Sequence, residues 1–143
     1  MSYSKAELTV ALRGFAHLFM SRDIERLVRL SATPFSFASP FGSKIITEPA
    51  EIRHGLNAFR DLMQQANVTR AEPEVLVIEQ ESTCRCAFQN RWTYYLPSGE
   101  VFNRTLVRYV FKRQVGAVPT QIEMAEYLNT SFPAAARFLL QEA

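Results

Sequence analysis

The hydrophobic period of this sequence changes from helical to strand-like about halfway along the chain, and this change limits the fold more than any single motif. In the first half, apolar residues follow one helix face in three segments, 8–19, 24–30 and 52–63. In the second half, apolar residues recur at alternate positions in four segments, 74–80, 82–96, 101–113 and 120–128. Helices followed by a run of strands favour an α+β fold, with three helices packed on one face of a curved antiparallel sheet.

The starts of the three predicted helices carry local sequence signals. Ser4 and Glu7 have the spacing of a capping box ahead of the first helix. Ser21 is expected to cap the second helix. Pro49 and Glu51 are start signals for the third.

Two short strands are predicted between the second and third helices. The segments "PFSFAS" (34–39) and "KIIT" (44–47) read as strands, and "SPFGS" (39–43) as the turn between them. At the other end of the chain, Pro133 is expected to open a short C-terminal helix.

One face of the longest predicted strand is almost wholly apolar. Its even-numbered residues include Cys84, Cys86, Phe88, Trp92, Tyr94 and Leu96. Several strands also carry apolar residues on their other face, which indicates that the sheet buries one side under the helices and the other against a partner. We therefore expect a homodimer that forms through the sheet.

Composition and charge argue against several classes of function. The 143 residues, of which 48% are hydrophobic and 21% charged, are expected to form one domain over residues 1–143. The basic residues behind the net charge of +2 are scattered singly, so no nucleic-acid partner is expected. No apolar run is long enough to span a membrane, and the first residues lack the pattern of a signal peptide. We therefore expect a cytoplasmic protein with no membrane contact.

The cysteines and histidines do not suggest a metal or redox site. Cys84 and Cys86 lie two residues apart on one side of a strand, which is poor geometry for a disulfide. His17 and His54 fall off the apolar stripes of their helices and are expected to face solvent. With so few ligands available, we expect neither a metal ion nor a cofactor.

The order of these elements resembles the nuclear-transport-factor-2-like superfamily over residues 5 to about 129. The resemblance rests on "SRDIERLVRL" running into "ATPFSFASPFGS", on "EIRHGLNAFRDLM" and on "IEMAEYL". This superfamily includes steroid delta-isomerases, polyketide cyclases of the SnoaL type, scytalone dehydratase and limonene epoxide hydrolase. The resemblance implies a cone-shaped, cystatin-like sheet closed by helices, a largely apolar pocket and often a dimer.

The catalytic residues of the steroid isomerases are not matched. The S-P-F-G-S turn resembles their D-P-x-G-S turn, but the position of their general base is occupied by Ser39. Their oxyanion-hole tyrosine corresponds to Phe15, and their second donor falls approximately on Arg108. Because all three roles have changed, this is not a steroid isomerase. The outward histidines and the lack of an Asp-Arg-Asp cluster likewise argue against dehydratase and epoxide hydrolase sites.

Arg108 and Glu126 are the candidates for catalytic residues. An inward Arg108 would bind a carboxylate or an enolate, and Glu126 lies on a predicted apolar face with Ile122 and Met124. The alternation of residues 101–113 favours an outward Arg108, whereas the resemblance places it in the pocket. Both alternatives remain open.

The predicted ligand-binding residues combine apolar rings with two polar groups. They are Phe15, Phe19, Phe37, Ser39, Phe59, Trp92, Tyr94 and Arg108. We favour a protein that binds a small apolar molecule, with a carboxylate on the ligand as one version of this interpretation. The alternatives are an isomerase, cyclase, dehydratase or hydrolase of a small hydrophobic metabolite, and a non-catalytic scaffold.

Overall fold

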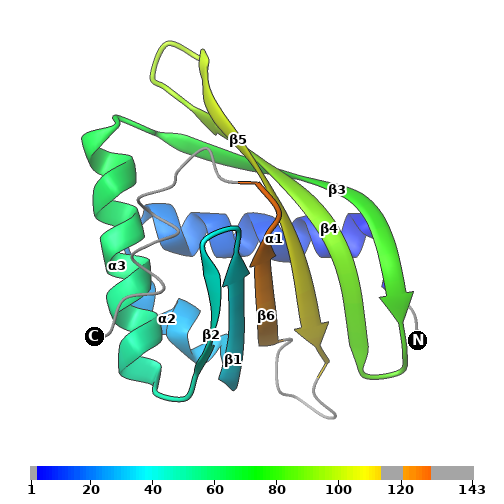
Figure 1. The fold of residues 1–143 in the computed structure, drawn as a ribbon. Coiled ribbons are helices and arrows are strands. Elements are labelled where there is room, and N and C mark those ends of the chain that lie inside the picture. Colours follow the sequence, from blue (N-terminus) through cyan, green and yellow to red (C-terminus); the bar gives the residue numbers. More distant parts are fainter. Residues whose placement is uncertain (1–2, 114–120, 130–143) are drawn as a thin grey trace.

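A computed structural model describes residues 3–113 and 121–129 of the protein (Figure 1). The three helices within these residues are α1 (Lys5–Met20), α2 (Ile24–Arg29) and α3 (Pro49–Gln65). The strands are β1 (Ser31–Ser39), β2 (Gly42–Ile46), β3 (Arg70–Glu81), β4 (Arg85–Tyr95), β5 (Val101–Lys112) and β6 (Gln121–Tyr127). The α+β class predicted from the sequence is confirmed. The helix expected after Pro133 lies outside the described residues.

The strands form one sheet in the order β2-β1-β6-β5-β4-β3. Neighbouring strands are antiparallel, except that β1 and β6 run parallel. The expected antiparallel sheet is therefore corrected to a mixed one. The path of the chain explains the parallel pair: α3 carries the chain from the β1–β2 hairpin to the opposite edge, and the β3–β6 meander then returns to β1 (Figure 1).

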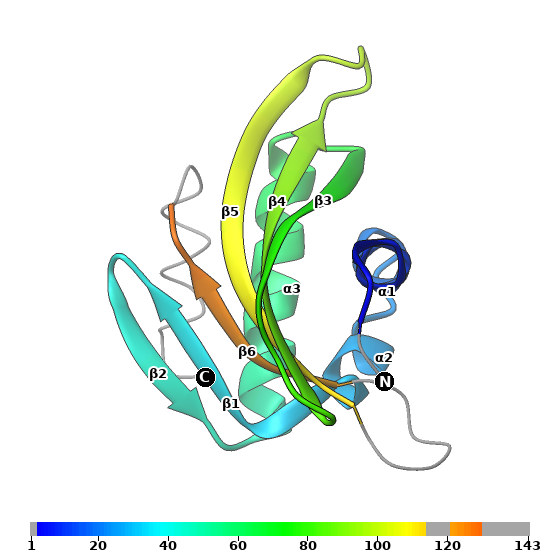
Figure 2. The same cartoon turned by 90° about the vertical axis from the view of Figure 1, so that its right-hand side faces the viewer.

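The sheet is strongly curved, and the helices lie on its concave side (Figure 2). Single extra residues interrupt the pairing at Leu76 and Glu79 in β3, at Phe102 in β5 and at Glu123 in β6. Such β-bulges bend a strand and increase its twist, so they contribute to the curvature. The concave side that results is the side on which the helices enclose the core.

The helix boundaries follow the predicted signals with one exception. Ser4 caps α1, because its side-chain oxygen accepts a hydrogen bond from the Glu7 N–H at 3.0 Å. The expectation that Ser21 caps the second helix is wrong: Ser21 ends α1 by donating its hydroxyl to the His17 carbonyl at 2.7 Å. Arg22 follows in a left-handed conformation with φ of 61°, and Asp23 becomes the N-cap of α2.

The even-numbered residues of β4 form part of the core, as predicted. Cys86 and Phe88 have no exposed surface, and Trp92 and Tyr94 are buried with them. Asn90 lies in the same row, opposite Val75 on β3 and Val107 on β5, and is also fully buried. In the described part of the chain neither polar atom of the Asn90 amide has a hydrogen-bond partner.

The expectation that both histidines are exposed is confirmed. His17 on α1 and His54 on α3 face solvent. Among the described residues, no helix combines the length and the apolarity needed to cross a membrane.

Candidate functional site

A cavity lies between the helices and the concave face of the sheet. The cavity has a volume of about 160 Å³, far more than a single water molecule needs. The aromatic residues in its wall are Phe15, Phe19, Phe35, Phe37, Phe59, Trp92, Tyr94, Tyr109 and Tyr127. Aliphatic side chains from α2, β2, α3 and β6 complete most of the remaining wall, among them Leu27, Ile46, Ile52, Leu56, Met63 and Ile122.

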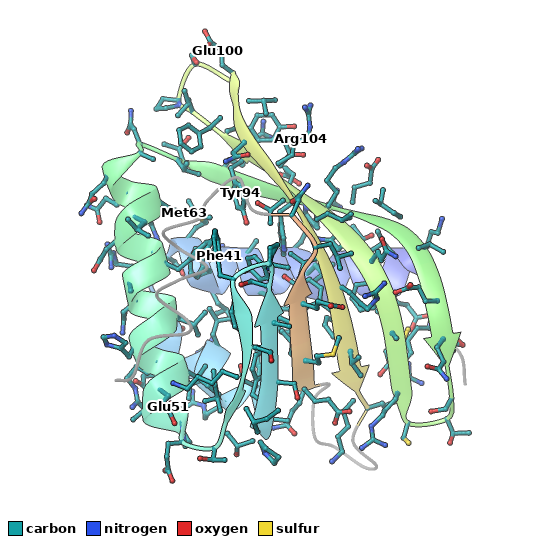
Figure 3. All side chains as sticks on the ribbon, in the orientation of Figure 1. Phe41, Glu51, Met63, Tyr94, Glu100 and Arg104 are labelled. Carbon is teal, nitrogen blue, oxygen red and sulfur yellow. The ribbon has the colours of Figure 1, made fainter. Side chains whose placement is uncertain are left out.

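The structure brings six of the eight predicted ligand-binding residues to this wall. They are Phe15 and Phe19 from α1, Phe37 from β1, Phe59 from α3, and Trp92 and Tyr94 from β4. The Phe19 and Phe59 rings contact each other across the two helices, with centroids 5.4 Å apart and planes tilted by 58°. Met63 on α3 and Tyr94 on β4 also line the cavity, and Figure 3 labels both side chains.

Ser39 does not line the cavity. It is the last residue of β1, and its side-chain oxygen accepts a hydrogen bond from the backbone N–H of Phe41 at 3.1 Å. The hydroxyl therefore stabilises the turn between β1 and β2, and the predicted role of Ser39 in ligand binding is corrected.

Arg108 does not line the cavity either. It lies on the outer face of the sheet, where Nε and Nη2 donate to the two carboxylate oxygens of Glu79 at 2.7 and 3.2 Å. A third nitrogen, Nη1, donates to Glu126 of the neighbouring strand. The alternative in which Arg108 enters the pocket is wrong, because Val107 and Tyr109 take the inward positions. The bulge in β5 lies at Phe102, so it does not change the alternation of residues 107–109.

The ion pairs around Arg108 favour the charged forms of Arg108 and Glu79. The hydrogen bonds that Arg108 donates to Glu79 and to Glu126 raise the pKa of Arg108, and the bond to Glu79 lowers the pKa of that carboxyl group. Gln89 on β4 adds a further donor to Glu79 at 3.1 Å. The candidate catalytic pair, Arg108 and Glu126, is thus formed in the structure, but it links strands on the outer face instead of reaching the cavity.

The bulge at Glu123 explains why the face of Glu126 was assigned wrongly. Strict alternation places Ile122, Met124 and Glu126 on one face. The extra residue shifts the register of β6 by one, because Phe111 pairs with Ile122 while Val110 pairs with Met124. Ile122 therefore turns into the cavity, whereas Met124 and Glu126 turn outward.

The polar part of the wall consists mainly of three tyrosines, two of which the sequence analysis did not single out. Tyr94, Tyr109 and Tyr127 come from β4, β5 and β6. The Trp92 Nε1–H donates to the Tyr109 hydroxyl oxygen at 2.7 Å, and both side chains are buried. The alternation of Val107, Tyr109 and Phe111 is the sequence signal that could have identified Tyr109.

All three phenols are held in their neutral form. Burial raises the pKa of Tyr127 to about 12. Burial also raises the pKa of Tyr94 and of Tyr109, and the proximity of the other phenols adds to this increase. At neutral pH these hydroxyls can donate a hydrogen bond, but they are not bases.

The described residues that line the cavity carry no formal charge. Within residues 3–113 and 121–129, no group of three or more histidine, cysteine or acidic side chains gathers in a way that could hold a metal ion. Cys84 and Cys86 are both unpaired, and burial raises the pKa of the Cys86 thiol to about 11. The wall is thus apolar apart from neutral hydrogen-bonding groups.

Comparison with known families gives one match along most of the chain. The model of a family described as "NTF2-like protein (DUF6841)" matches residues 6–117. No curated protein matches the sequence.

Solved structures show the same architecture at low sequence identity. An NTF2-like protein with a cystatin-like fold from Novosphingobium aromaticivorans superposes with a TM-score of 0.62 at 19% identity, over 96% of this chain and 88% of that chain. A protein of unknown function with a cystatin-like fold from Nostoc punctiforme gives 0.65 at 13% identity, over 94% and 99%. Aln2 from a Streptomyces species gives 0.63 at 16% identity, over 87% and 89%. At these identities the similarity establishes the fold and no activity.

Proposed function

This chain belongs to the NTF2-like family whose model covers residues 6–117, and we propose that it binds a small, uncharged, largely apolar molecule in its cavity. The observation that carries the proposal is the composition of the wall, in which aromatic and aliphatic side chains surround a few neutral polar groups. Each 100 Å² of apolar ligand surface that leaves water there contributes about 2.5 kcal/mol to binding before the entropic costs of association.

The absence of charge in the described wall argues for an uncharged ligand. A carboxylate in the cavity would lose its hydration without gaining a cation, which costs several kcal/mol. The version of the prediction in which the ligand carries a carboxylate depended on Arg108, and Arg108 is engaged by Glu79 and Glu126 on the outer face. We therefore propose a neutral ligand.

The same groups favour binding over proton-transfer catalysis. A general base must reach the proton that it abstracts and must be unprotonated near the working pH. The three phenols of the wall have raised pKa values, and Glu126 lies on the other side of the sheet. An enzyme acting on a small hydrophobic metabolite and a non-catalytic scaffold are the alternatives that the binding experiment tests.

A thermal-shift comparison of matched neutral and charged compounds tests this proposal. Naphthalene-1-carboxamide is expected to raise the melting temperature by several degrees at 100 times its Kd, and naphthalene-1-carboxylate much less at the same concentration. Leu56→Trp places a large ring in the cavity wall and should abolish the shift. Val10→Trp, at a position of α1 that is 69% exposed, is the matched control and should keep it. Equal shifts for both compounds, or a shift that survives Leu56→Trp, would contradict the proposal.

We also propose that two copies associate through the outer face of the sheet, as the sequence analysis predicted. Apolar side chains on that face support this proposal, since Ile45 on β2 is 61% exposed and Val77 on β3 is 43% exposed. A cytoplasmic location stays a prediction from the sequence.

A further inference from the structure

The Tyr109 hydroxyl accepts a hydrogen bond from Trp92, but its own proton has no acceptor among the described residues. A phenol offers one proton to an acceptor and two lone pairs to donors. The Trp92 indole N–H occupies one lone pair of the Tyr109 oxygen at 2.7 Å. Among the described residues, no acceptor for the Tyr109 proton is found, although the side chain is only 8% exposed. Buried hydroxyls nearly always have a partner, so the proton of Tyr109 is available to a molecule in the cavity.

The neighbouring groups make this end of the cavity rich in donors. Tyr127 lines the same wall from β6, and no hydrogen bond of its hydroxyl is found in the described part of the chain. The two tyrosines lie diagonally on neighbouring strands, because Tyr109 of β5 pairs with Ala125 of β6 and Val107 pairs with Tyr127. Burial raises the pKa of Tyr109, and the nearby Tyr127 adds to this increase. Donation from Trp92 polarises the Tyr109 O–H, because hydrogen bonds in a chain strengthen one another.

We propose that the ligand carries a carbonyl oxygen, which accepts hydrogen bonds from the hydroxyl protons of Tyr109 and Tyr127. The inference rests on the proposed function and names the chemical class of its ligand, a small apolar ketone. A carbonyl suits this site because it has two lone pairs for the two protons and brings no donor of its own. A ligand hydroxyl adds a proton that needs its own acceptor, and a hydrocarbon leaves the Tyr109 proton unpaired. The apolar body of the ketone packs against the Phe15, Phe19 and Phe59 side of the cavity.

Ligands of similar shape that differ in one polar group separate the contribution of the hydrogen bonds to binding from that of apolar burial. We would measure, by titration calorimetry, the Kd of 1-tetralone, 1-tetralol, tetralin and tetralin-1-carboxylate for the wild-type protein. Since one hydrogen bond contributes a modest net free energy, the ketone should bind between about threefold and tenfold more tightly than tetralin. Tyr109→Phe should remove this preference without abolishing binding of tetralin. Tyr95→Phe is the matched control on the outer side of β4, where the Tyr95 ring contacts Arg70, and it should keep the preference.

Infrared spectroscopy of bound 1-tetralone gives a second readout that does not depend on affinity. A carbonyl that accepts two hydrogen bonds absorbs at a lower frequency than the same ketone in hexane, and Tyr109→Phe should reverse part of this shift. Equal Kd values for ketone and tetralin, an alcohol that binds as tightly as the ketone, or an unshifted carbonyl band would each overturn the inference while leaving the cavity as a binding site. If none of the four compounds binds, the proposed function fails and the inference falls with it. If the carboxylate binds most tightly, the neutral-ligand proposal is refuted as well.

Discussion

Replacing Asn90 by leucine is expected to stabilise the protein. The side chain has no exposed surface, and neither Nδ2 nor Oδ1 has a hydrogen-bond partner among the described residues. An unsatisfied buried polar group costs about 1–3 kcal/mol, and an apolar group of similar shape avoids this cost. Val75 and Val107 lie opposite Asn90 on the neighbouring strands, so a leucine there would meet apolar partners.

The expected gain is about 2 kcal/mol if the cost of one unsatisfied group is recovered. For a chain near this size, 1 kcal/mol changes the melting temperature by about 2–4 °C, so Asn90→Leu should raise it by about 4–8 °C. Urea unfolding followed by circular dichroism would give the free energy of unfolding, and an unchanged m value would show that the two proteins unfold comparably.

Two further variants make this result decisive. Gln89→Leu changes the preceding residue of β4, whose amide donates to Glu79 on the outer face, and it should bring no gain. Asn90→Val is smaller than the leucine variant and therefore tests for overpacking. If both Asn90 variants lower the free energy of unfolding by more than about 1 kcal/mol, the Asn90 amide is satisfied after all, as it would be by an internal water molecule.

Three further predictions concern the tyrosines, the outer ion pairs and the assembly. Tyrosine in the unfolded chain ionises near pH 10 and Tyr127 in the fold at about 12. The unfolded state therefore loses its proton first, and the stability that Tyr127 contributes is present below pH 10 and falls by about 1.4 kcal/mol per pH unit up to pH 12. Urea midpoints at pH 9–12 should fall less steeply for Tyr127→Phe, and equal slopes would refute this. Arg108→Gln should lower the free energy of unfolding by about 1 kcal/mol or less, because the ion pairs of Arg108 are partly exposed. The same variant should leave the Kd of a cavity ligand unchanged. A large change in that Kd would place Arg108 at the site after all. If two copies associate through the outer face, Val77→Glu should shift sedimentation toward the monomer, whereas Val10→Glu on α1 should not.

Much of the fold could be predicted from local patterns, because period and capping depend on residues that are close in sequence. The alternation through Phe88, Trp92 and Tyr94 identified the buried face of β4, and Ser4 marked the start of α1. The Phe15, Phe19 and Phe59 rings were assigned to the pocket because they lie on the apolar stripes of their helices. Each of these assignments needed only the direction of a side chain relative to its own element.

The errors arose where the position of a side chain depends on a second element. Serine is a common N-cap residue, but the Ser21 hydroxyl donates to the His17 carbonyl in the last turn of α1, so Ser21 ends that helix. The prediction for Glu126 assumed regular alternation along β6. The bulge at Glu123 breaks this alternation, and alternation alone cannot reveal a bulge. The polar end of the cavity was missed for a related reason. The Trp92–Tyr109 hydrogen bond joins residues 17 positions apart, and its formation depends on the pairing of β4 with β5.

The bulge at Glu123 also determines how this cavity can change in evolution. One extra residue separates the inward Ile122 from the outward Met124 and Glu126. Loss of the Glu123 codon would remove the bulge without turning either half of β6 over, because Ile122 and Met124 would become neighbours and regular alternation would keep Ile122 inward and Met124 and Glu126 outward. The strand would lose only the local bend and extra twist that the bulge gives it. A one-residue deletion is therefore a short genetic route to a cavity of different curvature that is still lined by the same residues.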